Sequence, residues 1–163
     1  MPEGRAYIKR VKVVVLGNAE AGKSTLIKTL IPNSINIEHK GRTVALDFGV
    51  IEESGIRFHI FGTPGQERFK VVRDIISEGA GLFIYVFDPL IGVSKYDIEI
   101  ISLLKDRGLK GFFFINFKDS SEKDLNIDTL LSLLKQTNYP LISGSAKDLG
   151  IKREILKKLL SLL

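Results

Sequence analysis

Residues 17–25 read Gly17-Asn18-Ala19-Glu20-Ala21-Gly22-Lys23-Ser24-Thr25 and fit the pattern GxxxxGK[ST]. A β-branched run, Val11 to Leu16, precedes them, and apolar residues at helical spacing follow over Lys23 to Ile31. The motif therefore lies in a strand–loop–helix unit, which is the context that a phosphate-binding loop requires. The alternative is a glycine turn followed by a helix cap, and the flanking strand and helix favour the phosphate loop.

The predicted phosphate loop has separate groups for the phosphates and for the metal ion. Several backbone NH groups converge at a helix N-terminus, and glycines let the backbone approach an anion closely. Lys23 is expected to reach the β- and γ-phosphates of a nucleotide. Ser24 is expected to place its hydroxyl on Mg²⁺, because this cation prefers oxygen ligands and is held largely through phosphates and water.

Strands and helices alternate along the rest of the chain. Thr43 to Ile51 and Ile56 to Phe61 are predicted to form a hairpin across Ser54-Gly55, after a polar connection over residues 32–42. The other predicted strands, buried on both faces, are 82–87, 112–117 and 139–142, and the other predicted helices are 95–106, 125–136 and 152–163. This order predicts an α/β three-layer sandwich of the P-loop NTPase class, with a mostly parallel six-stranded sheet and one antiparallel strand.

Length and charge are those of one ordinary domain. The 163 residues are 44% hydrophobic, enough for a sizeable core, so one domain is expected over residues 1–163. The net charge of +5 is modest. Its densest run, at Lys152, Arg153, Lys157 and Lys158, is explained as well by a solvated helix face as by an acidic partner. Nucleic-acid binding is not expected, and a weak association with a membrane surface stays open.

Several classes of protein are excluded by absences in the sequence. There are no cysteines, so disulfides, zinc–cysteine sites, thiol nucleophiles and cysteine lipid anchors are ruled out. The N-terminus lacks an apolar signal region, and the longest apolar run, Gly79 to Phe87, is about half of what a membrane span needs. A cytoplasmic protein is therefore expected.

Four further motifs accompany the phosphate loop. They are Thr43-Val44-Ala45-Leu46-Asp47-Phe48-Gly49, Gly62-Thr63-Pro64-Gly65-Gln66-Glu67-Arg68-Phe69, Asn116-Phe117-Lys118-Asp119 and Ser145-Ala146-Lys147. With them the chain resembles, over essentially its whole length, the small Ras-like GTPases, and within these the bacterial and archaeal relatives of the MglA type. The resemblance implies a G domain that binds GTP or GDP with Mg²⁺.

The resemblance also implies roles for the residues around the γ-phosphate. Thr43 would place its hydroxyl on Mg²⁺ and its NH toward that phosphate, Gly65 would offer a second NH, and Gln66 would orient the attacking water. Lys23, Thr43 and Gln66 would thus be catalytic. Both switch segments would order around GTP and relax after hydrolysis, so that effector and regulatory proteins read the nucleotide state.

The base would be read by two segments. Asp119 would accept hydrogen bonds from guanine, and the Ala146 NH, supported by Ser145 and Lys147, would meet the guanine carbonyl oxygen. Asn116 would order the loops. Phe117 stands where the family carries lysine, and it either contacts the base or completes the apolar strand before it.

A second departure is Gly62, which stands where the family carries its magnesium-linked aspartate. If Ser54-Gly55 is a two-residue turn, Glu53 faces Ile56 and Gly62 lies across from Asp47. Cross-strand partners project from one face, so Asp47 is expected to extend over the glycine toward the metal. The alternative is an ordinary surface carboxylate, since a bulge would turn Asp47 away.

These features favour a small monomeric-type GTPase with slow intrinsic hydrolysis. Ala19, where many relatives carry glycine, is expected to crowd an inserted arginine finger. Two alternatives stay open: a nucleotide-holding scaffold with little hydrolysis, suggested by Gly62 and Phe117, and an ATP-binding P-loop protein, suggested by the altered base motif.

Overall fold

A seven-stranded sheet organises the computed structural model, which describes residues 9–38, 45–63, 69–118 and 127–163. The strand order is β2-β3-β4-β1-β5-β6-β7, and among the described strands β3 alone runs opposite in direction to the other six. The strands are β1 (Lys9–Gly17), β2 (Ile35–Glu38), β3 (Ala45–Glu53), β4 (Ile56–Gly62), β5 (Leu82–Phe87), β6 (Lys110–Asn116) and β7 (Leu141–Gly144). The helices are α1 (Lys23–Leu30), α2 (Phe69–Ser77), α3 (Lys95–Asp106), α4 (Asp128–Lys135) and α5 (Ile151–Ser161).

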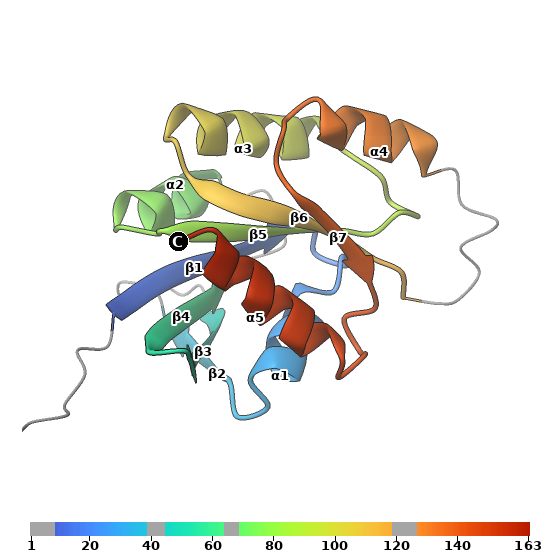
Figure 1. The fold of residues 1–163 in the computed structure, drawn as a ribbon. Helices are drawn as coiled ribbons and strands as arrows, with labels where there is room; N and C mark the ends of the chain where they lie inside the picture. Colours follow the sequence, from blue (N-terminus) through green and yellow to red (C-terminus); the bar gives the residue numbers. More distant parts are fainter. Residues whose placement is uncertain (1–8, 39–44, 64–68, 119–126) are drawn as a thin grey trace, which may run out of the picture.

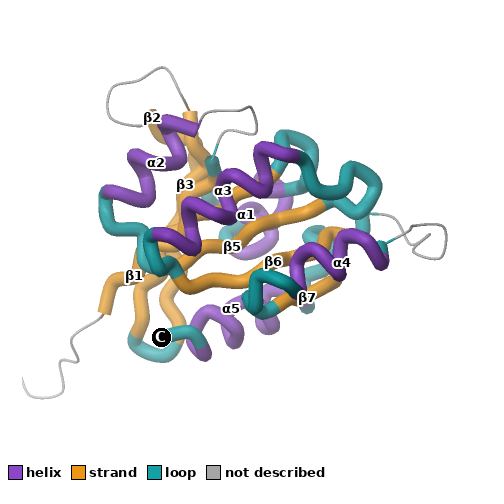
Figure 2. The backbone as a smooth tube through the Cα atoms, turned by 90° about the horizontal axis from the view of Figure 1, so that it is seen from above, coloured by secondary structure: helices purple, strands orange, loops and turns teal. Residues whose placement is uncertain are grey.

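Helices cover both faces of the sheet, as the three-layer prediction required. Figure 1 shows α1 and α5 on one face and α2, α3 and α4 on the other, and the view from above in Figure 2 shows the same two helical layers. Successive residues of β1 alternate between the layers, because side chains of a strand point to opposite faces. Val13 and Val15 join the cluster under α1 and α5, whereas Val14 and Leu16 join the cluster under α2, α3 and α4.

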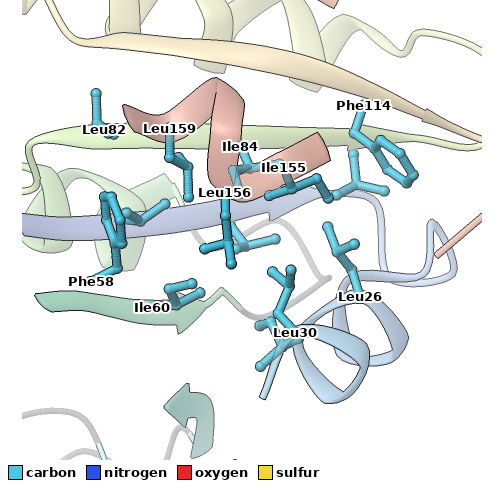
Figure 3. Packing of buried hydrophobic residues seen from close by; sticks show 14 of the residues in the cluster. Leu26, Leu30, Phe58, Ile60, Leu82, Ile84, Phe114, Ile155, Leu156 and Leu159 are labelled. Carbon is cyan, nitrogen blue, oxygen red and sulfur yellow. The ribbon is translucent and has the colours of Figure 1, made fainter. Parts of the chain in front are cut away.

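The cluster between the sheet and α1 and α5 fixes the strand and helix on either side of the phosphate loop. Leu26 and Leu30 of α1 point into it from one side and Ile155 and Leu159 of α5 from another (Figure 3), and all four are fully buried. Burying one such side chain stabilises the fold by about 1.5–3 kcal/mol. The loop is therefore held between two rigid elements.

The predicted strand number was wrong by one. The added strand, β2, lies within the segment predicted as a polar connection and pairs antiparallel with β3, with Ile35 opposite Phe48. It is an edge strand, and Ile35 is 59% exposed. Its stability therefore comes from backbone pairing with β3, which its short, half-polar sequence does not reveal.

Two further differences concern α2 and β7. The sequence reasoning identified no helix at Phe69–Ser77, although Val71, Val72, Ile75 and Ile76 are buried at helical spacing. The prediction that the last strand is buried on both faces was wrong: Leu141 and Ile142 are only partly buried. The reason is that β7 is an edge strand, with β6 as its one neighbour in the sheet.

The hairpin forms with the predicted register. Ser54 and Gly55 have φ angles of 52° and 78°, the left-handed conformation that a two-residue type I′ turn needs. Glu53 then lies opposite Ile56, and the pairing continues without a bulge to Phe48 opposite Phe61. The carboxyl ends of β1, β5, β6 and β7 meet at one edge of the sheet, where ligands bind in open α/β folds.

Candidate nucleotide-binding site

Two glycines fix the path of the phosphate loop. Gly17 has a φ of 143°, and a Cβ there would lie 2.4 Å from the Val86 carbonyl oxygen of the neighbouring strand. Gly22, directly before α1, has a φ of 105°, and a Cβ there would lie 2.3 Å from Nδ2 of Asn116. Any larger residue would collide at both positions, so the loop can lie this close to β5 and to the end of β6 only with glycine.

Lys23 is buried inside the loop that it follows. Its Nζ donates to the carbonyl oxygens of Gly17 at 2.6 Å and Asn18 at 2.8 Å. Burial lowers the pKa of Lys23 to about 8, and the carboxylates of Asp97 and Asp47 partly oppose this shift. A desolvated ammonium fixed at a helix N-terminus is a strong attractor for an anion, because both the charge and the free NH groups of the helix favour it.

Ser24, Asp47 and Gly62 form a second cluster beside the loop. The Ser24 hydroxyl donates to Oδ2 of Asp47 at 2.6 Å. A Cβ on Gly62 would lie 3.3 Å from Cβ and 3.6 Å from Oδ2 of Asp47, so the aspartate does extend over the bare glycine, as the hairpin register predicted. A hydroxyl and a carboxylate side by side are the oxygen donors that Mg²⁺ prefers, usually together with nucleotide phosphates.

Among the described residues, Ser24 and Asp47 alone form the candidate metal position. No group of three or more His, Cys, Asp or Glu residues that could hold a metal ion occurs in the part of the chain that the structure describes. The described residues therefore do not form a metal site made of protein side chains alone. Ser24 and Asp47 fit a magnesium ion whose remaining ligands come from phosphate and water.

Asn116, at the end of β6, joins the phosphate loop to the loop after β7. Its Nδ2 donates to the Ala21 carbonyl oxygen at 2.8 Å, and its Oδ1 accepts from the Ala146 NH at 2.9 Å. The Thr29 hydroxyl of α1 holds the carbonyl oxygen of Ala146 at 2.5 Å. Asn116 therefore connects the phosphate loop to the loop after β7. The contact of the Ala146 NH with guanine stays a prediction; in this structure that NH donates to the buried Asn116.

The residues after Asn116 point in two directions. Phe117 is partly buried and packs against the core cluster under α2, α3 and α4, which favours its completing the strand over its contacting the base. Lys118 instead reaches the phosphate loop: its Nζ donates to the Glu20 carbonyl oxygen and lies 3.2 Å from Oδ2 of Asp88. The sequence reasoning missed Lys118 as a site residue, although a lysine one position after Phe117 was a signal for it.

These segments surround one cavity of about 460 Å³. It is lined by residues of the phosphate loop, the start of α1, the end of β6 and the loop after β7: Ala19, Glu20, Gly22, Lys23, Ser24, Thr25, Asn116, Lys118, Ser145, Ala146 and Lys147. Most described members of the predicted site are thus brought together, with Asp47 beside Ser24, whereas Phe117 packs into the core instead. Thr43, Gly65, Gln66 and Asp119 lie outside the described residues, and their roles stay predictions.

The sheet order, the phosphate loop and this cavity define the class: a P-loop domain of the G-domain type. Solved structures agree. The chain superposes on bacterial selenocysteine-specific elongation factor EF-Sec with a TM-score of 0.68 and 26% identity, covering 95% of this chain and 29% of that one. It superposes on the FeoB G-domain from Methanococcus jannaschii with a TM-score of 0.67 and 24% identity, covering 94% and 96% of the two chains.

Sequence relatives narrow the class to a family. The family model described as "Ras of Complex, Roc, domain of DAPkinase" matches residues 12–105, more than half of the chain. An uncharacterized protein of Methanocaldococcus jannaschii is 40% identical over 114 residues, 70% of this chain and 74% of its own. The chain therefore belongs to the Roc family of Ras-like GTPase domains.

Two better-known relatives are only partly covered. Ras-related protein Rab-36 of Mus musculus is 36% identical over 89 residues, which is 52% of this chain and 33% of Rab-36. The tRNA modification GTPase MnmE of Pseudothermotoga lettingae is 30% identical over 166 residues, covering 94% of this chain and 36% of MnmE. The likeness to these two proteins thus concerns about a third of each.

Proposed function

We propose that this chain is a guanine-nucleotide switch that hydrolyses GTP to GDP and phosphate with Mg²⁺. The observation that carries the proposal is the convergence on one cavity of the phosphate loop, the Ser24–Asp47 pair and the loops joined by Asn116. The family supports a GTPase in general, and Rab-36 and MnmE carry Ras-related and GTPase names.

We assign each site residue a role, and for the described residues the positions support it. Lys23 and the NH groups of residues 17–25 bind the phosphates, and Ser24, Thr43 and Asp47 hold Mg²⁺, Asp47 through the Ser24 hydroxyl. When bound, Mg²⁺ neutralises charge that develops on the β- and γ-phosphate oxygens. Gln66 orients the attacking water, Gly65 donates to the γ-phosphate, and Asp119 selects guanine by accepting from its two donors.

The rest of the proposal concerns the rate of hydrolysis, the protein partners and the cellular localisation. Intrinsic hydrolysis is slow, because phosphoryl transfer needs charge stabilisation that Ras-like domains often obtain from a partner's arginine. Effector and regulatory proteins read the two nucleotide states. No described helix is long and apolar enough to cross a membrane. We propose a cytoplasmic protein of the MglA-type group.

One experiment tests the proposal directly. Labelled GTP is bound in the presence of Mg²⁺, unlabelled GTP and ATP compete for the site, and phosphate release is followed in the same tube. We expect competition by GTP alone, with slow release. Tight binding without release would replace the switch by a nucleotide-holding scaffold, and competition by ATP would overturn the guanine assignment. Gln66→Leu separates binding from turnover, and Lys23→Met is the control that should abolish binding.

A further inference from the structure

Lys118 connects three separate segments of the chain. Its ammonium donates to the Glu20 carbonyl oxygen in the phosphate loop and pairs with Asp88, which follows β5. The end of its methylene chain passes Gly22, where Cε would lie 3.9 Å from a Cβ. The lysine therefore lies along the phosphate loop and lines the cavity together with residues 145–147.

Asp88 is placed to hold this lysine. Its side chain is only 7% exposed, and its Oδ1 accepts from the Leu90 NH at 2.8 Å, which fixes the carboxylate and leaves Oδ2 for Lys118. A buried carboxylate is costly without a compensating partner. The ion pair is thus unlike the exposed pair of Glu52 and Arg57, which lies on the hairpin away from the loop.

We propose that Asp88 and Lys118 form a clamp that holds the phosphate loop from the base side. Asp88 is a positioning residue: it fixes the ammonium of Lys118, and Lys118 fixes the carbonyl of Glu20. Phe117 cannot make this contact with the phosphate loop, because its side chain packs in the core on the α3 side of the sheet. Its effect on nucleotide retention rests on the proposed nucleotide-binding function, but its effect on the loop itself does not.

The first test therefore reads the loop without nucleotide. Hydrogen–deuterium exchange is measured on peptides that cover residues 17–25 in the wild type, Lys118→Met, Asp88→Asn and the double variant. We expect each single variant to speed exchange about 5- to 20-fold, as for a partly exposed charged hydrogen bond, and the double variant to add little, because both changes break one unit. Lys110→Met, at the exposed opposite end of β6, is the matched control and should change nothing.

A second test reads the bound nucleotide. Labelled GDP should dissociate about 5- to 20-fold faster from either variant, with Lys118→Arg retaining most of the wild-type rate. Urea unfolding distinguishes the clamp from a general loss of stability, since retention should change far more than the midpoint. Unchanged exchange over residues 17–25 would overturn the clamp whether or not nucleotide binds. Absence of binding in the wild type would instead refute the proposed function.

Discussion

The proposed replacement of the magnesium-linked aspartate by Asp47 makes the sharpest prediction. Asp47→Asn keeps the shape of the side chain and removes the charge that accepts the 2.6 Å hydrogen bond from Ser24. Hydrogen bonds to charged groups are worth about 1.5–3 kcal/mol, which corresponds to roughly 10- to 100-fold in an equilibrium constant. Loss of a residue that orients a metal ligand costs about the same factor in metal affinity. We therefore expect GDP to dissociate about 10- to 100-fold faster in the presence of Mg²⁺.

The assay compares the dissociation of fluorescent GDP with Mg²⁺ and with a chelator. The variant should differ from the wild type only when Mg²⁺ is present, because Asp47 acts through the metal. Glu52→Gln is the control: it removes a carboxylate of the same strand that pairs with Arg57 on the hairpin. Equal rates for wild type and Asp47→Asn in Mg²⁺ would show that Asp47 is an ordinary surface carboxylate. An equal acceleration in chelator would show that it acts without the metal.

Three further predictions test other parts of the site. Burial lowers the pKa of Lys23 to about 8, so the folded chain releases this proton at a lower pH than the unfolded chain does. The free energy of unfolding should therefore rise with pH above 8. Between pH 7.5 and 9.5, urea unfolding should show the wild type gaining about 2 kcal/mol in this free energy relative to Lys23→Met. A constant difference would contradict the shifted pKa. Gly62→Ala places a Cβ 2.6 Å from Cδ1 of Ile27 and should destabilise the protein by about 1–3 kcal/mol. Ile27→Val removes that Cδ1 atom, so the double variant should lose less stability in thermal unfolding than the sum of the two single variants. Gln66→Leu should slow phosphate release from GTP and leave GTP affinity unchanged; equal turnover would dismiss its water-orienting role.

The sequence predicted those parts of the fold that local rules determine. The path of the phosphate loop follows from Gly17 and Gly22, which stand at positions where a Cβ would collide with neighbouring atoms. The hairpin register follows from Ser54-Gly55, whose positive φ angles define the turn. Edge strand β2 escaped prediction because its partner, β3, supplies its stability. Helix α2 is the opposite case: the helical spacing of its apolar residues is a local signal, although no helix was predicted there. These residues are Val71, Val72, Ile75 and Ile76.

The candidate site was predictable in position and less so in its contacts. The motifs give the segments that meet at the sheet edge, but a sequence does not give the direction of a side chain. Lys118 shows this, since its neighbour Phe117 occupies the family's lysine position and packs into the core. The Ala146 NH shows it as well, because its hydrogen bond to the Asn116 side chain does not follow from the motif.

The two departures from the Ras-like pattern have one physical explanation. At the candidate metal position the carboxylate comes from β3 instead of β4. A Cβ on Gly62 would lie 3.3 Å from Cβ of Asp47 and 2.6 Å from Cδ1 of Ile27, so glycine at the end of β4 suits this arrangement. At the base motif the ammonium comes from Lys118, one residue later, while Phe117 fills the core. In each case a charged group reaches the loop from an adjacent position, and the residue at the family's own position fits the packing around it. Gly62 and Phe117 are therefore better explained as parts of a working site than as signs of a lost one.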